Sequence, residues 1–275
     1  MTMGKTIFVL LDACQFVGGT VNLGYLEHMA EYKMCAKYKV KGELPSLSRP
    51  MYETLMTGLP VYRHGVTHND CVRRSDKENI FYLCKKNGLR SGAAAYFWMS
   101  ELYNHAPFDR VKDRIRMEKE GLIDYGIYYW EDIYPDTHLF ADGEYIRKTY
   151  APDFMVYHSM GIDEWGHIKG SESKEYLGAI AAIGEILSIY IPQWLDEGYE
   201  IVVTADHGMN PLGMHGGTDS VQRDTPLYIF SDKILKGRFD EAYISQLNIA
   251  PLLCHLLEIP LSDAMIQPNE IRGLL

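Results

Sequence analysis

Six residues of the types that bind metal ions follow apolar runs along this chain. They are Asp12, Asp163, His167, Asp206, His207 and His215. Aspartate and histidine without cysteine suit zinc or manganese better than magnesium or calcium. Six side chains are too many for one tetrahedral site, but they suffice for two sites of three ligands each. We therefore expect two divalent metal ions, zinc or manganese, with room for a nucleophile and a substrate oxygen.

Each of these residues also has an ordinary structural interpretation. Asp12 could cap a helix, and Asp163 and His167, four positions apart, could form a solvated helical pair. His215 could lie on the surface, since its loop is rich in glycine, and Ser48 could serve as a helix N-cap. These interpretations weaken together, because all of the residues are expected at the same edge of one sheet.

Strands and helices alternate along the chain. Apolar runs predict strands over residues 5–13, 90–98, 151–161, 199–205 and 225–231. Periodicity and capping residues predict helices from the first strand to about Lys37 and over 48–58, 75–88, 173–198 and 244–260. The pattern predicts an α/β fold, a single mostly parallel central sheet with helices on both faces. Functional groups gather at the carboxyl ends of such strands.

The stretch 98–150 is different, because it is charged, weakly periodic and rich in tyrosine and tryptophan. We expect it to form a small cap inserted into a single domain that spans residues 1–275. Its aromatic residues could stack on a base or sugar, although core and lid packing is the commoner role of such side chains. These are Tyr125, Tyr128, Tyr129, Trp130 and Tyr134.

The formal net charge of −10 argues against a nucleic acid polymer or an anionic membrane as a partner. The five cysteines include no C-x-x-C pair, which favours a reducing compartment. Asp12 interrupts the first apolar run, unlike a secretory signal, and we expect no apolar stretch of about 18 residues that could span a membrane. The expectation is a soluble, cytoplasmic protein; the oligomeric state is left open.

Several segments together resemble a known superfamily. In order they are LLDA, LPSLSRPMYETLMTGLPVYRHGVTHN, GIDEWGHIKG, TADHGM and MHGG, and they resemble the metal-site motifs of the alkaline phosphatase superfamily. The branch they resemble most is the nucleotide pyrophosphatase/phosphodiesterase family, whose nucleophile precedes a run of the form x-P-x-x-x-T-L-x-T-G. That position is Ser48 here. The family usually has threonine there, so serine is a departure that keeps the hydroxyl.

The resemblance implies an alkaline phosphatase-like catalytic domain with two metal sites. One site would consist of Asp163, His167 and His215, and the other of Asp12, Asp206 and His207. The Ser48 oxygen would be a further ligand of the second site and the attacking nucleophile. Asn69 matches the asparagine that hydrogen-bonds a phosphoryl oxygen, a role that backbone N–H groups near Arg49 could share.

Charge balance bears on the substrate. Two dications would be neutralised by three aspartates and a Ser48 alkoxide, so a singly charged diester is accepted more easily than a doubly charged monoester. Arg49 is the one obvious additional cation, although we favour a solvated first-turn arginine. The sequence thus predicts a small phosphate-ester substrate. It favours a phosphohydrolase that cleaves phosphodiester or pyrophosphate bonds through a phosphoseryl intermediate, with phosphomonoester or phosphonate hydrolysis as the alternative.

Three other functions are less favoured. Phosphoryl mutases of this superfamily carry large extra domains, and about 50 residues of cap are too few for one. A scaffold without catalysis does not need Ser48 together with a full ligand set. A sulfatase needs a modifiable residue in a C/S-x-P-x-R setting, which the segment SLSRPM does not supply.

Overall fold

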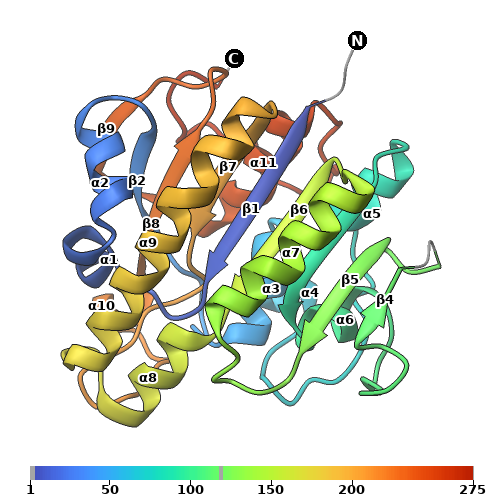
Figure 1. The fold of residues 1–275 in the computed structure, drawn as a ribbon, viewed down its shortest axis with the longest axis horizontal. Coiled ribbons are helices and arrows are strands. Elements are labelled where there is room, and N and C mark those ends of the chain that lie inside the picture. The colour runs from blue at the N-terminus through green and yellow to red at the C-terminus, as the bar shows by residue number, and fades with distance from the viewer. Residues whose placement is uncertain (1–3, 118–119, 275) are drawn as a thin grey trace.

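The computed structural model describes residues 4–117 and 120–274, and it places one nine-stranded sheet between two layers of helices (Figure 1). The strands are β1 (Lys5–Leu11), β2 (Ala36–Lys41), β3 (Ser91–Tyr96), β4 (Ile115–Arg116), β5 (Tyr125–Tyr129), β6 (Phe154–Ser159), β7 (Tyr199–Thr204), β8 (Asp224–Phe230) and β9 (Gly237–Ser245). Their order across the sheet is β4-β5-β3-β6-β1-β7-β8-β2-β9.

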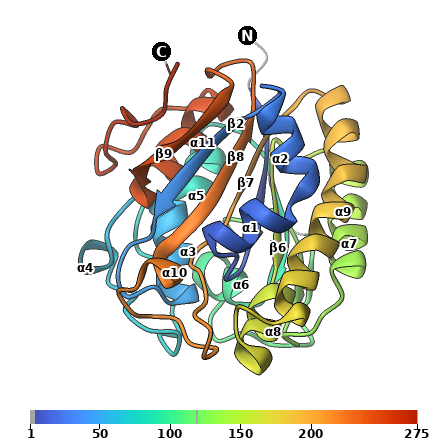
Figure 2. The same cartoon turned by 90° about the vertical axis from the view of Figure 1, so that its left-hand side faces the viewer.

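Helices cover both faces of this sheet (Figure 2). They are α1 (Phe16–Asn22), α2 (Gly24–Glu31), α3 (Ser48–Thr57), α4 (Val61–His64), α5 (Ile80–Lys86), α6 (Trp98–Tyr103), α7 (Asp136–Tyr150), α8 (Gly161–Lys169), α9 (Lys174–Asp196), α10 (Ser220–Arg223) and α11 (Ile249–Leu257), with a 3₁₀ turn at Gln246–Asn248. Parallel pairs join β1 to β6 and β7, β3 to β5 and β6, and β2 to β9, whereas β8 and β4 pair antiparallel. The prediction of a mostly parallel α/β sheet is confirmed.

The central strand β1 explains why the sheet needs both helical layers. Its side chains alternate between two buried clusters, because successive residues of a strand point to opposite faces. Phe8 and Leu10 belong to the cluster that includes residues of α3, α5 and α11. Ile7, Val9 and Leu11 belong to the cluster that includes residues of α2, α7 and α9. With apolar side chains on both faces, β1 is fixed in place, and so is the loop that follows it.

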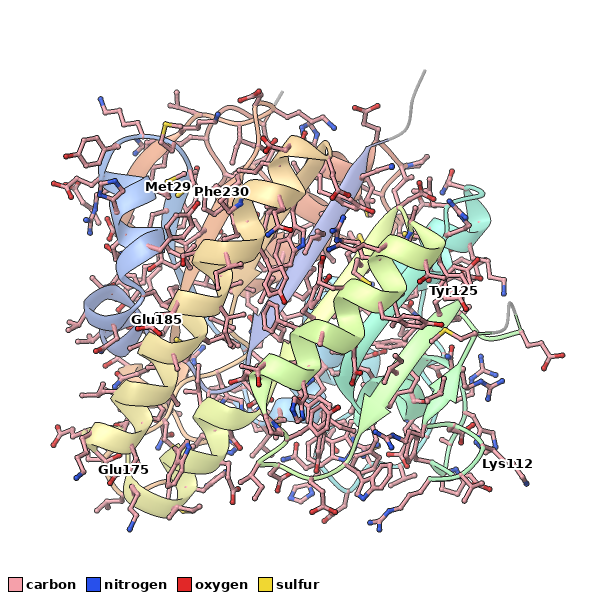
Figure 3. The ribbon with its side chains drawn as sticks, in the orientation of Figure 1. Met29, Lys112, Tyr125, Glu175, Glu185 and Phe230 are labelled. Atoms are coloured by element: carbon pink, nitrogen blue, oxygen red, sulfur yellow. The ribbon has the colours of Figure 1, made fainter. Side chains whose placement is uncertain are left out.

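Helix α9 corrects the expectation that no apolar stretch is long enough to span a membrane. Within the described parts of the chain, it is the one helix that meets this test by length and composition. One side of the helix packs into the cluster on its face of the sheet, through residues that include Ile183, Leu187 and Trp194. Glu185 lies on the exposed side of the same helix (Figure 3). This is the arrangement of an amphipathic core helix.

Outside the region 98–150, two strands were missed by the sequence analysis. Strand β2 overlaps the end of the stretch that was expected to be helical as far as Lys37. Strand β9 spans residues 237–245, for which no strand was predicted. The alternating segment AKYKVK is lysine-rich, and it pairs with β8 on one side and β9 on the other. Lys37 can be buried in this strand because it pairs with Glu27 and Asp240, which lie elsewhere in the sequence.

The region 98–150 contributes more to the sheet than a cap does. Strand β5 pairs in parallel with β3 and carries Tyr125 near the outer edge of the sheet (Figure 3). Helix α7 packs against β3 and β6. Much of the region therefore extends the main α/β layers, because the tyrosine-rich run YGIYY is buried as a strand.

Two helix boundaries differ from their predictions. Helix α5 begins at Ile80 instead of near Ser75, because the Asn79 side chain caps it by accepting a hydrogen bond from Tyr82 N at 3.1 Å. The closing helix α11 begins at Ile249, since residues 244–245 end strand β9. The predicted helices 48–58 and 173–198 correspond to α3 and α9.

We expect Lys37→Met to destabilise the fold by about 3 kcal/mol, because it removes a fully buried ammonium that pairs with two partly buried acids. The Lys37 ammonium is fully buried and lies 2.7 Å from Glu27 and 3.1 Å from Asp240. Urea unfolding measures the loss. The control Lys41→Met removes a partly exposed pair with Asp224 and should cost less than about 1 kcal/mol. Equal losses in the two variants would contradict this account.

Candidate metal centre

All six ligand-type residues lie at the carboxyl ends of the three central strands. Asp12 follows β1 directly, and Asp206 and His207 follow β7. Strand β6 leads into α8, which carries Asp163 and His167 one turn apart. Because β1 is hydrogen-bonded to both β6 and β7, these three connections open side by side. His215 reaches the same place from the loop after β7.

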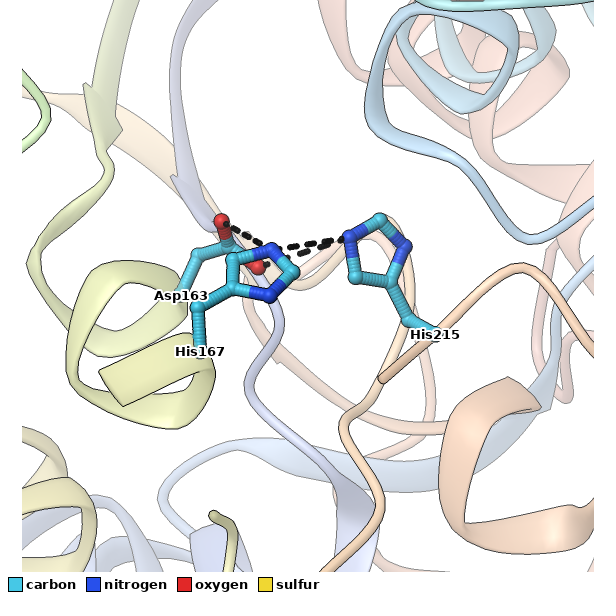
Figure 4. A group of neighbouring side chains, drawn as sticks. All are labelled: Asp163, His167 and His215. Carbon is cyan, nitrogen blue, oxygen red and sulfur yellow. Dashed lines mark hydrogen bonds and ion pairs between the residues drawn. The ribbon is translucent and has the colours of Figure 1, made fainter. Parts of the chain in front are cut away.

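The first group, which we call the Asp163 cluster, consists of Asp163, His167 and His215 (Figure 4). The Nε2 atom of His167 lies 3.3 Å from Asp163 Oδ2 and 3.2 Å from His215 Nε2. His215 Nε2 is 3.8 Å from Asp163 Oδ1. All three side chains therefore direct one ligand atom each to a common point, which is the arrangement that a bound cation requires.

The second group, the Asp12 cluster, consists of Asp12, Asp206 and His207, and all three are fully buried. His207 Nε2 lies 3.4 Å from Asp12 Oδ1 and 3.3 Å from Asp206 Oδ2. The ring of His207 stacks on the ring of His215, with centroids 3.9 Å apart and planes 12° apart. This stacking holds the two clusters next to each other.

The three histidines share one protonation pattern. Each Nδ1 lies at hydrogen-bonding distance from a backbone carbonyl: His167 from Gly213 at 2.8 Å, His207 from Gly208 at 3.0 Å and His215 from Ser46 at 3.0 Å. Since a carbonyl can only accept, Nδ1 carries a proton in each ring, and Nε2 is the nitrogen that each ring directs toward the cluster. Outer partners of this kind orient metal-binding histidines in many proteins.

Glycine shapes the loop that makes this possible. Gly213 has a φ of 74°, and a side chain there would meet the His167 carbonyl at 2.8 Å. Glycine adopts this left-handed conformation without the strain that a Cβ atom would cause. The backbone of the loop can therefore approach α8 closely enough to receive the His167 hydrogen bond.

The aspartates each keep one oxygen without a hydrogen bond. Asp12 Oδ1, Asp163 Oδ1 and Asp206 Oδ2 are buried and have no hydrogen-bond partner among the described residues. A buried carboxylate oxygen without a partner is costly. These three atoms face the three Nε2 nitrogens, so each cluster combines unpaired oxygen with nitrogen donors. Divalent metal ions fit this donor set, and zinc or manganese suits its mixture of carboxylate and imidazole.

The electrostatics of the clusters lead to the same conclusion. Burial raises the pKa of Asp206 well above its usual range, and repulsion by Asp12 and Asp163 adds to this shift. Burial likewise raises the pKa of Asp163. The His215 pKa is lowered to about 4, mainly by burial, so that imidazole is neutral at pH 7 and compensates no acid. The hydrogen bond with Asp163 raises the pKa of His167 to about 9, so one imidazolium compensates part of the carboxylate charge, and bound cations would supply the rest.

Ser48 and Asn69 lie at the same edge. Ser48 is the first residue of α3, and its hydroxyl donates to His207 Nε2 at 3.0 Å. The interpretation of Ser48 as an N-cap is therefore wrong, because Leu47 occupies that position. Asn69 Oδ1 accepts a hydrogen bond from Arg49 N at 3.0 Å, which leaves its amide nitrogen as the group that can donate to a substrate.

Arg49 is not a solvated side chain. It is 1% exposed, its guanidinium donates to Glu101 Oε2 at 2.7 Å, and it lies 4.7 Å from the centre of the Trp98 ring. Its backbone N–H already donates to Asn69. Arg49 thus anchors α3 to α6. Its guanidinium is paired with Glu101, so it does not supply the additional positive charge considered above for a monoester substrate.

Two residues next to Asp12 were missed by the sequence analysis. His158 Nε2 lies 3.1 Å from Asp12 Oδ2, and the Tyr52 hydroxyl donates to the same oxygen. In the sequence, His158 sits within an apolar strand and Tyr52 within a helix, where both resemble core residues. The weak signal for His158 was its place one residue before the end of a strand that neighbours β1.

Comparison with known proteins identifies a matching family. A sequence profile for type I phosphodiesterase / nucleotide pyrophosphatase matches residues 14–228. Human GPI ethanolamine phosphate transferase 2, catalytic subunit, is 22% identical in an alignment of 272 positions that covers 94% of this chain and 26% of that protein. GPI ethanolamine phosphate transferase 2 of Debaryomyces hansenii is 29% identical over 138 residues, covering 44% of this chain and 16% of that protein. The chain thus spans about a quarter or less of the length of these relatives.

Solved structures share the fold. Murine ectonucleotide pyrophosphatase / phosphodiesterase 5 in complex with AMP superposes with a TM-score of 0.74 at 14% identity, over 98% of this chain and 100% of that one. Ps i-CgsB in complex with k-i-k-neocarrahexaose superposes with a TM-score of 0.68 at 16% identity, over 98% of this chain and 75% of that one. Because the identities are only 14% and 16%, these comparisons show the fold alone, which is alkaline phosphatase-like.

We expect the contribution of Glu53 to the free energy of unfolding to fall as the pH rises from about 4.5 to 6. Burial raises the Glu53 pKa to about 6 from 4.5, although hydrogen bonds from Ser75 and Tyr103 oppose the shift. In this window the unfolded chain releases the proton that the folded chain retains, so the contribution of Glu53 falls by about 2 kcal/mol. Urea unfolding of metal-free protein at pH 4.5 and 6.5 should show this loss as a difference between the native chain and Glu53→Gln. The comparison is needed because burial lowers the pKa values of His64 and His215 to about 4, which makes stability rise with pH in both proteins. The exposed change Glu185→Gln is the control, and an unchanged pH dependence in Glu53→Gln would refute the assignment.

We expect the two clusters to bind one metal ion each and to lose them separately. Asp163→Ala and His215→Ala should weaken the same ion, although the residues lie 52 positions apart, whereas Asp12→Ala should weaken the other. Competition with a chromogenic zinc chelator reports the number and affinity of the bound ions in each variant. A native protein that binds one ion or none, or variants that lose the wrong ion, would contradict the two clusters.

Proposed function

Because this chain belongs to the type I phosphodiesterase / nucleotide pyrophosphatase family, we propose that it hydrolyses phosphodiester or pyrophosphate bonds through a phosphoserine on Ser48. The observation that carries the proposal is the position of the Ser48 hydroxyl. It lies 3.0 Å from His207 Nε2, in the Asp12 cluster, and the ring of His207 stacks on His215 of the neighbouring cluster. No other hydroxyl was predicted as nucleophile from the sequence.

The two clusters would hold the metal ions: Asp12, Asp206 and His207 one of them, and Asp163, His167 and His215 the other. Bound there, divalent ions, which we propose to be zinc, would lower the pKa of the Ser48 hydroxyl and offset negative charge on phosphoryl oxygens. The start of helix α3 adds a favourable field of the same sign at Ser48.

The proposed reaction has two steps. Ser48 Oγ forms a bond to phosphorus while the bond to the leaving oxygen breaks, and the leaving group departs with the electron pair and later gains a proton. Water then attacks the phosphoserine, the Oγ–P bond breaks, and Ser48 recovers a proton. The amide nitrogen of Asn69 donates a hydrogen bond to a phosphoryl oxygen in both steps, since its oxygen is held by Arg49 N.

Charge supports a diester or pyrophosphate over a monoester. The Arg49 guanidinium is paired with Glu101 and so does not supply the additional cation that a doubly charged monoester would want. The net charge of −10 also supports a small phosphate ester over a nucleic acid polymer. Hydrolysis of phosphomonoesters or phosphonates remains the alternative to test in the same substrate panel.

A phosphoryl transferase is a second candidate, favoured by the match of the human ethanolamine phosphate transferase to 94% of this chain. The first step would be the same, and an alcohol would replace water in the second. A hydrolase releases the leaving group and the phosphoryl group at equal steady-state rates in water. A transferase would release the leaving group steadily only after an acceptor alcohol is added.

We expect Ser48→Ala to keep its fold and its metal ions but to lose several orders of magnitude in turnover of bis-nitrophenyl phosphate. Ser48→Thr should retain measurable activity, because it keeps the hydroxyl. Acid-quenched native enzyme should carry the phosphoryl adduct on Ser48, detected by mass spectrometry. The control Ser100→Ala changes a buried serine whose hydroxyl has no hydrogen-bond partner within the described part of the chain, and it should be neutral. Near-native turnover in Ser48→Ala, with no adduct in the native enzyme, would eliminate the covalent mechanism.

A further inference from the structure

We propose that His158 and Tyr52 are positioning residues that decide which oxygen of Asp12 faces the metal of the Asp12 cluster. This inference rests on the proposed function only in that the cluster binds a metal. A carboxylate can rotate and present either oxygen, or both, to a cation. Here both donors contact Oδ2, and Oδ1 is left without a hydrogen bond, 3.4 Å from His207 Nε2.

The hydrogen bonds of His158 identify it as a donor and not as a ligand. Its Nδ1 accepts a hydrogen bond from Tyr96 N at 3.3 Å, so the proton of the neutral ring is on Nε2 and points at Asp12. This is the opposite tautomer from that of His167, His207 and His215, whose Nδ1 atoms donate to carbonyls. His158 therefore holds a ligand in place, whereas the other three direct Nε2 toward the clusters.

The sheet itself aims His158 at Asp12. In the parallel register of β1 and β6, Leu10 lies opposite His158, and the ladder continues as Asp12 N donates to Ser159 O at 3.0 Å. The Tyr129 hydroxyl donates to His158 O at 2.7 Å. Strands β3, β5 and β6 thus all contribute to the orientation of the one carboxylate that follows β1.

Tyr52 connects the same carboxylate to the helix of the nucleophile. It lies one turn after Ser48 on α3, and its hydroxyl reaches Asp12 Oδ2. The Tyr52 ring also packs edge-on against the His158 ring, with centroids 4.7 Å apart. The two donors therefore fix each other as well as Asp12, and α3 cannot shift Ser48 relative to Asp12 without breaking this contact.

The chain contains a matched histidine for comparison. His64 is also buried, its Nδ1 accepts from Val66 N at 3.1 Å, and its Nε2 lies 3.0 Å from Thr54 Oγ1. It belongs to neither metal cluster. Replacing His64 removes a buried imidazole with the same hydrogen-bond pattern, so it separates a general loss of stability from an effect on Asp12.

The test measures zinc affinity with a chromogenic chelator in two backgrounds. Asp163→Ala leaves the Asp12 cluster intact, and Asp206→Ala leaves the Asp163 cluster intact. In the first background, His158→Leu and Tyr52→Phe should each weaken zinc binding about 10- to 100-fold, the usual loss when a ligand loses its outer hydrogen bond. In the second background, both should leave affinity within about threefold. His158→Gln, which keeps a donor at the same reach, should recover most of the affinity.

The outcomes separate this inference from the proposed function. If the native chain binds no zinc, the metal centre itself is wrong. If the native chain binds two ions and both variants bind them unchanged, or if both clusters weaken equally, the positioning role is wrong and the metal centre stands. His64→Leu should lower stability without changing zinc affinity in either background. Tyr52→Phe keeps the buried ring, so it decides the question even if His158→Leu fails to fold.

Discussion

Three buried carboxylates share one edge of the sheet, and most of the local structure follows from the need to compensate their charge. Asp12 and Asp206 are fully buried, and Asp163 nearly so, because they follow central strands that are covered on both faces. Burial alone raises the pKa of an acid, and neighbouring acids raise it further. Burial lowers the pKa values of His207 and His215, so these imidazoles compensate no acid. The hydrogen bond with Asp163 raises the pKa of His167 to about 9, and Arg49 is already paired with Glu101. One imidazolium does not balance three carboxylates, and bound ions would supply the remaining positive charge.

The surrounding structure orients the donors for those ions. Backbone carbonyls of Ser46, Gly208 and Gly213 hold the Nδ1 atoms of three histidines, so every Nε2 atom points inward. His158 and Tyr52 turn Asp12 in the same sense. The helix that carries Ser48 is tied to α6 through Arg49 and to Asp12 through Tyr52. Nucleophile and ligands are thus preorganised by packing, which an enzyme needs to hold reacting groups in place.

Sequence reasoning found the residues that follow strongly apolar runs, because a charged group at the end of a buried strand is a clear signal. It missed His158 and Tyr52, whose roles depend on the register of β6 against β1 and on the pitch of α3. It took Arg49 as solvated, because its partner Glu101 lies 52 positions away. It missed β2 because the lysines of that strand look like an exposed face until Glu27 and Asp240 are placed beside Lys37. Local patterns predict elements, whereas long-range pairs decide which polar side chains are buried.

The most direct test is a crystal structure of the zinc-loaded protein with anomalous diffraction at the zinc edge. The account predicts two anomalous peaks in each chain. One should contact Asp12 through Oδ1, Asp206 through Oδ2, His207 Nε2 and the Ser48 hydroxyl oxygen, and the other should contact Asp163, His167 Nε2 and His215 Nε2. A single peak, or a zinc ion bound to Asp12 through Oδ2 with His158 turned away, would contradict the account.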